Sequence, residues 1–402
     1  MLLDGLLQRF VQRGSLTMID AKGVTHKYVG QGGPEVTIRL KDEKLQQQLF
    51  FNPELHAGEA YMDGRLTVEQ GTIRDFLVLF AQNSANLRGH PLQKALRTAS
   101  KKVKKLKGFN SEKASRENVR HHYDLSNDFY RLWLDTDMQY SCAYFMSDTD
   151  TLEQAQINKL RHIAAKLDLK PGQRILDIGS GWGGMALYLA SVADVEVLGV
   201  TLSTEQHALA TQRAKERGLD DRVRFELLDY RNAQGPFDRI VSVGMFEHVG
   251  VQQFEAYFSK IRDLLTEDGV ALVHSIGRKG GPGQTGKWVR RYIFPGGYSP
   301  ALSETLASVE RSGLWVTDIE ILRLHYAKTL RIWDERFQAN RAQIAEMMDE
   351  RFCRMWEFYL IISELSFSHG KHMNFQIQLT KHPRATPLTR DYMVESERLL
   401  PD

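Results

Sequence analysis

The sequence predicts an α/β fold, a doubly wound parallel sheet with helices on both faces, preceded by a smaller N-terminal α+β domain. The 402 residues are 42% apolar and 26% charged, which is typical of a globular protein with two or three domains and excludes a disordered or fibrous chain. From Gly172 onward, short apolar runs alternate with segments of helical pattern. This order indicates parallel strands joined by helices.

Residues 1–85 are predicted to form the small α+β domain, with a role in docking or assembly. Short alternating runs such as LTMID and TIRL are broken by glycine-rich turns such as GQGG, and such alternation favours half-buried strands. Nothing in this part of the sequence has the spacing of a metal site, and no metal is predicted. We therefore expect the chemistry to lie elsewhere.

Residues 86–117 are predicted to form a basic amphipathic helix that links the two domains. Between Arg88 and Lys107 there are eight Lys or Arg and no acid, so removing these eight charges from the net charge of +3 leaves −5 for the rest of the chain. Apolar residues recur there at spacings of three or four, on one face of a helix. Such a helix can bind anionic lipid or a nucleic-acid backbone, or it can be a solvated linker packed on its own protein.

Residues 118–402 are predicted to form the catalytic domain. Its expected strands are five apolar runs: QRILDIG, VEVLGVTL, VRFELLD, FDRIVSVG and GVALVHSIG. In open parallel sheets, ligands bind beyond the carboxyl ends of the strands. The residues that follow each run are therefore the candidates for a site.

The turn after the first run is rich in glycine, which lets a backbone turn tightly and approach a ligand closely. Gly179, Gly181 and Gly184 fit the GxGxxG spacing of dinucleotide-binding folds, but methyltransferases that use S-adenosylmethionine have similar turns. The second run ends in Thr201, where dinucleotide-binding folds usually have an acid that holds the ribose. This difference favours the methyltransferase interpretation.

Several motifs in a fixed order resemble the cyclopropane-fatty-acid synthase family, which includes mycolic-acid cyclopropane synthases. They are HYDLSNDFY, YSCAYF, LDIGSGWGG, GVTLSTEQ, DRIVSVGMFEHVG and YIFPGG, and the likeness extends from about Val119 to Phe375. The N-terminal GEAYMDG element resembles the bacterial members that act on phospholipids. The resemblance implies a class I S-adenosylmethionine methyltransferase fold with a Rossmann-like sheet.

By this resemblance the cofactor is S-adenosylmethionine. Its expected contacts are Tyr123, Ser141, Gly179, Gly181, Thr201, Gln206 and Asp229. Considered without the resemblance, Thr201 and Gln206 are better explained as a helix cap and a surface residue.

Four polar residues are candidates for the reacting centre: Glu247, His274, Cys142 and Tyr326. Glu247 and His274 follow neighbouring strands, so the strand-end rule brings them to one edge of the sheet. Each residue also has a structural explanation, as a helix N-terminus for Glu247 and as core residues for the others. The resemblance implies that the four, with the backbone of Ile276, hold a bicarbonate ion that acts as the base, with Glu247 as the acceptor that orients it.

The resemblance implies an enzyme that transfers a methyl group to the cis double bond of a phospholipid acyl chain and closes a cyclopropane. The alternatives are a related lipid C-methyltransferase that makes methyl-branched or methylene chains, and a non-catalytic lipid-binding protein on the same scaffold. Aromatic residues between Tyr326 and Phe375 are expected to be mainly helix core and in part to line an acyl-chain pocket. Arg290 and Arg291 are candidate contacts to a lipid phosphate.

The expected partners are membrane phospholipids with cis-unsaturated chains and an anionic membrane surface, and the resemblance implies a homodimer. With only two cysteines, without the pattern of a secretory signal and without an apolar run long enough to span a bilayer, the chain is expected to be cytoplasmic and peripheral on the inner face of the membrane. No nucleic-acid partner is expected, because GMFEHVG follows the fourth run where DNA methyltransferases have an Asn-Pro-Pro-aromatic or Cys motif.

Overall fold

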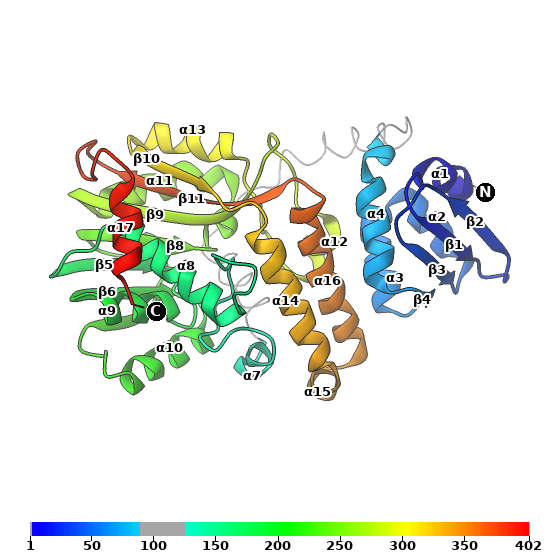
Figure 1. Ribbon diagram of the computed structural model, residues 1–402, viewed down its shortest axis with the longest axis horizontal. Helices are drawn as coiled ribbons and strands as arrows, with labels where there is room; N and C mark the ends of the chain where they lie inside the picture. Colours follow the sequence, from blue (N-terminus) through cyan, green and yellow to red (C-terminus); the bar gives the residue numbers. More distant parts are fainter. Residues whose placement is uncertain (1, 89–124, 402) are drawn as a thin grey trace. The chain divides into compact units, whose positions relative to one another are not determined.

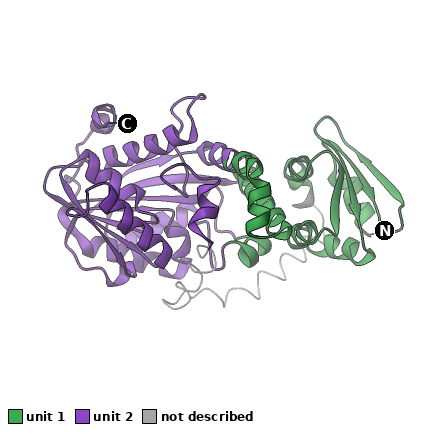
Figure 2. Ribbon diagram, turned by 90° about the horizontal axis from the view of Figure 1, so that it is seen from below, with its two compact units in different colours: residues 1–108, 285–293, 333–370 green, residues 109–284, 294–332, 371–402 purple. Residues whose placement is uncertain are grey.

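The computed structural model describes residues 2–88 and 125–401, which divide into two compact units (Figures 1 and 2). Of these residues, unit 1 contains those up to 88 together with 285–293 and 333–370, and unit 2 contains the remainder. Most of the predicted basic helix, residues 86–117, and Tyr123 lie outside the described residues. In the described part of the chain, no helix combines the length and apolar character needed to cross a membrane.

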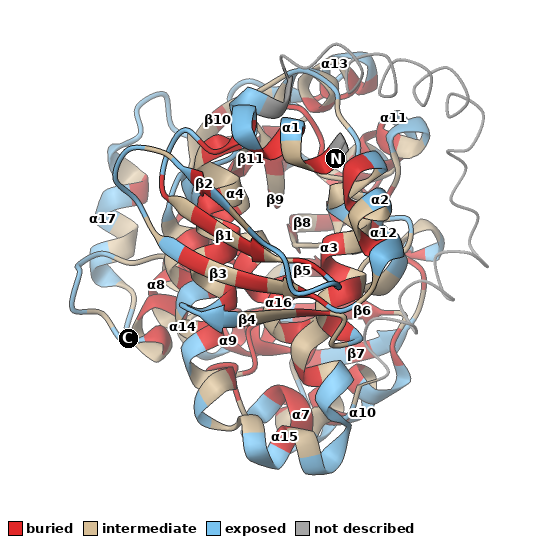
Figure 3. Ribbon diagram, turned by 90° about the vertical axis from the view of Figure 1, so that its right-hand side faces the viewer, coloured by how far each residue is buried: buried red, intermediate tan, exposed pale blue. Residues whose placement is uncertain are grey.

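Unit 1 contains a four-stranded sheet in the order β2-β1-β3-β4. Its strands are β1 (Ser15–Ile19), β2 (Thr25–Val29), β3 (Glu35–Leu40) and β4 (Leu66–Gln70). β1 and β3 are parallel and the other neighbours are antiparallel. Buried and less buried residues alternate along β1 and β3 (Figure 3). The buried ones include Leu16, Met18, Val36 and Ile38. One face of this sheet therefore forms the core of the unit.

The helices of unit 1 come from distant parts of the sequence. They are α1 (Leu2–Phe10), α2 (Glu43–Phe51), α3 (Pro53–Met62), α4 (Ile73–Arg88), α12 (Lys287–Tyr292), α15 (Arg341–Met347), α16 (Glu350–Ser368) and the end of α14 (His325–Ala339). α16 packs against both α3 and α4. This grouping differs from the predicted boundaries, in which residues 118–402 form one domain.

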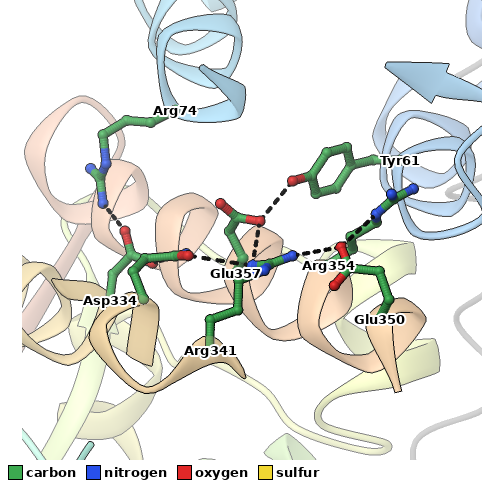
Figure 4. Close-up of polar contacts among 8 residues, drawn as sticks. Tyr61, Arg74, Asp334, Arg341, Glu350, Arg354 and Glu357 are labelled. Atoms are coloured by element: carbon green, nitrogen blue, oxygen red, sulfur yellow. Dashed lines mark hydrogen bonds and ion pairs between the residues drawn. The ribbon is translucent and has the colours of Figure 1, made fainter. Parts of the chain in front are cut away.

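Buried charges join α4 to the helices that follow residue 333 (Figure 4). Arg74 donates from Nη2 to Asp334 Oδ2 at 2.7 Å and also pairs with Glu364. Tyr61 of α3 donates its hydroxyl to Glu357 Oε2 at 2.7 Å. Both carboxylates of the Arg74 group are buried, so the arginine is required to compensate their loss of hydration.

Aromatic side chains of the 326–375 region, expected to be mainly helix core, form core in unit 1 where they fall in that unit. Phe358 packs on Trp288, with ring centroids 4.8 Å apart, and on Tyr61 at 6.3 Å. Arg291, a candidate lipid contact, donates to Glu59 Oε1 at 2.8 Å. Trp333, Phe337 and Trp356 are likewise buried, as expected for helix core.

Unit 2 contains a seven-stranded sheet in the order β10-β11-β9-β8-β5-β6-β7. Its strands are β5 (Gln173–Ile178), β6 (Val195–Thr201), β7 (Val223–Leu227), β8 (Phe237–Val243), β9 (Leu265–Arg278), β10 (Trp315–Ile321) and β11 (His372–Thr380). β5 to β9 are mutually parallel, as predicted. β11 departs from the predicted parallel arrangement because it pairs antiparallel with both β9 and β10.

Helices cover both faces of this sheet (Figure 1). α8 (Leu152–Leu167), α9 (Gly184–Val192) and α10 (Thr204–Glu216) share one core with the strands, and α11 (Phe254–Leu264) and α13 (Leu302–Ser312) share the other. Leu272 of β9 belongs to the core with α8, and Val273 to the opposite one. Because side chains alternate along a strand, His274 faces the α8 side. The unit is completed by α7 (Asn127–Arg131), α17 (Asp391–Leu399) and three short 3-10 turns, Tyr230–Asn232, Phe246–His248 and Val251–Gln253.

Candidate active site

A pocket lies at the carboxyl edge of the unit 2 sheet, where β5, β6, β7 and β8 end. Its lining includes six of the seven residues predicted to contact a cofactor: Ser141, Gly179, Gly181, Thr201, Gln206 and Asp229. The seventh, Tyr123, is not among the described residues. The glycines, Thr201, Gln206 and Asp229 follow β5, β6 and β7, whereas Ser141 comes from the segment before α8. Residues that are up to 88 positions apart in the sequence thus meet at this edge.

The glycine turn after β5 forms one wall of the pocket. Gly179 has φ +81°, a conformation that L side chains rarely adopt, and a Cβ there would lie 2.9 Å from Met245. A Cβ on Gly184, at the start of α9, would lie 1.8 Å from Gln139 Nε2. Glycine is therefore required at position 179, whereas a Cβ at position 184 would displace the end of the Gln139 side chain from the pocket wall.

The end of β6 supplies two hydroxyls and an amide. Ser203 caps α10, because its side chain accepts from Gln206 N at 3.3 Å. Thr201 Oγ1 donates to Gln206 Oε1 at 3.1 Å, and Gln206 is only 6% exposed. The cap is therefore Ser203, while Thr201 and the buried Gln206 face the pocket.

Asp229, after β7, is held by its own neighbour. Arg231 donates to both carboxylate oxygens, from Nε at 2.8 Å and from Nη2 at 2.6 Å. The carboxylate also accepts from Arg231 N at 3.0 Å. These bonds fix Asp229 at the rim of the pocket, with the Arg231 charge beside it.

The sequence interpretation missed Lys159, a buried cation of α8 behind this pocket. Its Nζ donates to Gln139 Oε1 at 2.6 Å and to Ser141 Oγ at 3.0 Å. Burial lowers the pKa of Lys159 to about 8, although Asp135 acts in the opposite direction. Burial likewise raises the pKa of Asp177 to about 7. The signal was available, since Lys159 falls on the apolar face of α8, four residues from both Ala155 and Ile163.

The remaining lining residues are mostly apolar and include Met138, Ile178, Met185, Leu202, Leu228 and Val243. An apolar slot that carries hydroxyl, amide and carboxylate groups at its margins is the general form of a small-molecule site. Asp177 Oδ2, in the same lining, is buried without a hydrogen-bond partner in the part of the chain that the structure describes. These residues fit a nucleoside cofactor with a charged amino-acid end.

Glu247 lies in the turn after β8, next to this pocket in the sequence. Its Oε1 accepts from the Ile276 N–H at 2.6 Å, while Oε2 is buried and has no hydrogen-bond partner among the described residues. Burial raises the pKa of Glu247 to about 7, against the opposing effect of the Ile276 N–H. The carboxyl group can therefore exchange a proton near neutral pH.

His274 lies in β9, two residues before Ile276, and is 1% exposed. Its Nδ1 is 3.2 Å from Gln376 Nε2, and its Nε2 is 3.2 Å from Asn374 Nδ2. Burial lowers the pKa of His274 to about 3, so the ring is neutral at pH 7. His274 lies within β9, whereas the sequence predicts it after that strand. It is opposite Val243, the last residue of β8, and so lies near the turn that carries Glu247.

Cys142 and Tyr326, the other two candidates, are both buried in unit 2. The Cys142 thiol donates to Ala143 O at 3.3 Å, and burial raises its pKa, so the group is a thiol and not a nucleophilic thiolate. Ala143 N donates to Thr329 Oγ1 at 3.1 Å, which ties the Cys142 segment to α14. Tyr326 lies in the first turn of that helix, three residues before Thr329.

The sequence matches the mycolic acid cyclopropane synthetase family over residues 110–377. It is 41% identical over 331 residues to the cyclopropane-fatty-acyl-phospholipid synthase of Escherichia coli K12, covering 82% of this chain and 84% of that protein. It is 40% identical over 345 residues to a probable fatty acid methyltransferase of Pseudomonas putida, covering 84% and 85%.

Among solved structures, the chain is similar to the mycolic acid cyclopropane synthase CmaA1 complexed with SAH and CTAB. The TM-score is 0.62 at 35% identity, and the match covers 66% of this chain and 97% of that one. The structural neighbours confirm the class I methyltransferase fold that the sequence predicts.

Proposed function

Because the chain belongs to the mycolic acid cyclopropane synthetase family, we propose that it methylates the cis double bond of a phospholipid acyl chain and closes a cyclopropane ring. It is a methyltransferase that uses S-adenosylmethionine. The observation that carries the proposal is Glu247, a buried carboxyl group with one oxygen anchored on Ile276 N and the other without a partner among the described residues.

An isolated double bond is a weak nucleophile, and its attack on a sulfonium methyl group leaves a carbocation beside the new methyl. Ring closure then requires that this methyl lose a proton. The site must therefore contain a base and exclude water, which would trap the cation as an alcohol. S-adenosylmethionine, when bound, supplies the electrophilic methyl group.

The cofactor is assigned to the pocket lined by Ser141, Thr201, Gln206 and Asp229. Ser141 is held by Lys159, and Gln206 by Thr201. These bonds restrict the polar groups before any ligand arrives, which reduces the ordering cost of binding. The Lys159 cation also helps to balance the buried Asp177 carboxyl group.

Bicarbonate, when bound, supplies the base that accepts the methyl proton. Glu247 fits such an ion, because its free Oε2 can accept the O–H of bicarbonate in a charge-assisted hydrogen bond. The Ile276 N–H donates to Glu247 in the structure, so we assign it to anchoring the carboxylate. His274 and Tyr326 are proposed as donors to the anion, and Cys142 as part of its buried surroundings.

We further propose that the protein works at an anionic membrane surface as a homodimer. The basic segment between Arg88 and Lys107 supports the membrane part. Drawing the double bond away from the bilayer interior requires the enzyme to remain at that surface.

The direct test incubates the purified protein with S-adenosylmethionine and vesicles of cis-monounsaturated phospholipid. Fatty acid methyl esters are then analysed by mass spectrometry before and after catalytic hydrogenation. We expect a product heavier by one CH₂ that takes up no hydrogen. A heavier product that does take up hydrogen is a methylene or methyl-olefin chain, the second candidate, which the similarity to a probable fatty acid methyltransferase supports.

A further inference from the structure

The His274 ring lies at the end of a buried hydrogen-bond chain that begins on α8. Lys166 Nζ pairs with Glu320 of β10 and donates to Gln376 Oε1 at 2.7 Å. Gln376 Nε2 is 3.2 Å from His274 Nδ1. Gln376 and His274 are directly opposite each other on β11 and β9, so their side chains lie side by side on the face that α8 covers.

Lys166 determines which way the Gln376 amide points. An ammonium group only donates hydrogen bonds, so the amide oxygen must face Lys166 and the amide NH₂ must face His274. The reverse orientation would place two donors against each other. Lys166 and Gln376 are at most 2% exposed, so water would not compensate that arrangement.

The orientation of Gln376 in turn determines where His274 carries its proton. A neutral imidazole has one N–H and one lone pair, and the group bonded to one nitrogen sets the state of the other. Because Gln376 donates to Nδ1, the lone pair is on Nδ1 and the proton is on Nε2.

The surroundings of Asn374 support a proton on His274 Nε2. Its amide is 3.2 Å from His274 Nε2, and its Oδ1 is buried without a hydrogen-bond partner among the described residues. Oxygen and nitrogen of such an amide are assigned from the network around them. With the proton on Nε2, the Asn374 oxygen faces the ring and gains the hydrogen bond that it lacks.

We propose that Lys166 and Gln376 are positioning residues that hold His274 as the Nε2–H tautomer. The Nε2–H, which the Asn374 oxygen accepts in this structure, is then the one donor that the ring can offer to the catalytic anion in place of Asn374. The Nδ1 lone pair is held by Gln376, so the ring does not compete with Glu247 for the proton. The role of this donor rests on the proposed function, whereas the tautomer itself does not. Lys166 and Gln376 touch neither cofactor nor substrate in this assignment and act through His274.

The tautomer can be read directly by NMR of protein labelled with ¹⁵N-histidine. Long-range correlations distinguish the protonated from the unprotonated ring nitrogen, and the His274→Gln variant identifies the His274 signals among the 13 histidines. We expect a protonated Nε2 and an unprotonated Nδ1. A wild-type spectrum with the proton on Nδ1 overturns the proposal.

The Gln376→Glu variant should reverse the tautomer. A carboxylate accepts from both Lys166 and Nδ1–H, so the proton moves to Nδ1. Gln378→Glu is the matched control, because Gln378 lies on the same face of β11 and bonds to Tyr392 and the Lys166 carbonyl. The Gln378→Glu variant adds the same negative charge to β11, two residues from Gln376. An unchanged tautomer in Gln376→Glu, or the same reversal in Gln378→Glu, contradicts the assignment.

Kinetics then separate this inference from the proposed function. In Gln376→Glu we expect kcat to fall about 10- to 100-fold, the usual effect of losing the partner that orients a functional histidine. The Kd for S-adenosylmethionine should stay within about twofold, and Lys166→Arg, which keeps a donor cation, should retain the wild-type tautomer and most of the activity.

If the wild type makes no lipid product, the proposed function fails while the NMR result still decides the tautomer. A reversed tautomer with unchanged kcat overturns the positioning role.

Discussion

Glu247 shows how one buried carboxyl group is kept reactive. The Ile276 N–H anchors one oxygen at 2.6 Å, and burial raises the pKa of the group to about 7. A carboxyl group in bulk water would be fully ionised at this pH. The surroundings of Glu247 therefore favour a group that shares a proton with a bound anion.

Replacing Glu247 with Gln should abolish turnover while preserving the fold. The amide oxygen can still accept from Ile276 N, but the NH₂ group cannot accept a proton. We expect wild-type affinity for S-adenosylmethionine by calorimetry and a loss of product by mass spectrometry. Unchanged turnover would exclude Glu247 from the reacting centre.

The same variant should change how stability depends on pH. The pKa of Glu247 is raised in the folded protein, so its contribution to stability is complete below the unfolded pKa near 4.5 and is lost as pH rises to about 7. Between pH 5 and pH 8 the wild type should lose about 2 kcal/mol more than Glu247→Gln. Urea unfolding at both pH values measures this difference, and equal losses would contradict the burial argument.

His162 should have a pH effect of the same sign in a higher range. Burial disfavours its charged form, but hydrogen bonds to Glu320 Oε2 at 2.7 Å and Glu397 Oε2 at 3.0 Å outweigh burial and raise the pKa. Its contribution to stability is therefore present below about pH 6.5 and is lost as pH rises through the folded pKa. Glu247 is fully ionised over most of this range, so the two effects can be separated.

The measurement compares the wild type with His162→Gln at pH 6.5 and pH 9. The wild type should lose stability over this interval, and the variant should lose less, by about 1 kcal/mol for each unit by which the pKa is raised. Parallel losses in the two proteins would mean that His162 is not charged in the fold.

At the residue scale, the sequence predicted the residues that line the cofactor pocket better than the buried residues that hold them in place. The predicted cofactor residues line one pocket because strand ends converge in any sheet of this kind. Lys159 and Lys166 were missed, although both lie on the buried face of α8, because a hydropathy pattern does not tell which partner compensates a buried charge. Only the folded structure places Gln139, Ser141 and Gln376 around them.

At the element scale, strands with consecutive apolar residues were predictable and a strictly alternating strand was not. The run predicted over 237–244 forms β8 (Phe237–Val243), in which the neighbours Ile240 and Val241 are buried in the cores on opposite faces of the sheet. β11 was not predicted, since Asn374, Gln376 and Gln378 alternate with its apolar residues. These amides are buried because they bond to α8 and His274. The polar pattern that conceals β11 in the sequence therefore belongs to the buried hydrogen-bond network around His274.

The packing of α4 on α14 and α16 should depend on Arg74. Its replacement by Met leaves Asp334 and Glu364 buried without their cation, and losing one partner of a buried ion pair costs about 3 to 5 kcal/mol. We expect urea unfolding of Arg74→Met to show this loss. Adding Asp334→Asn and Glu364→Gln should recover most of it, whereas no recovery would mean that the arginine acts through packing alone.

At the scale of the whole molecule, the net charge of +3 conceals an uneven distribution. The eight basic residues between Arg88 and Lys107 contrast with a rest of the chain at −5, which is obtained by subtracting them from the total. Each basic residue near an anionic bilayer contributes about 1 kcal/mol to binding. The charge distribution thus supports a membrane-surface enzyme more strongly than the overall composition does.

Binding to anionic vesicles should therefore depend on salt. Co-sedimentation should show binding at low ionic strength and its loss at high ionic strength, because salt screens surface charges. A variant with Lys101, Lys102, Lys104 and Lys105 changed to Gln should bind weakly at all salt concentrations. Binding that is insensitive to salt, or a variant that binds like the wild type, would contradict an electrostatic origin.

In the proposed reaction the transferred methyl group loses a proton and becomes the ring carbon. This is tested by supplying S-adenosylmethionine with a CD₃ methyl group and counting the deuterium in the lipid product by mass spectrometry. We expect a hydrogenation-resistant product that retains two of the three deuterium atoms. A product that retains all three would show that the proton is lost from the acyl chain, and this result would contradict ring closure at this site.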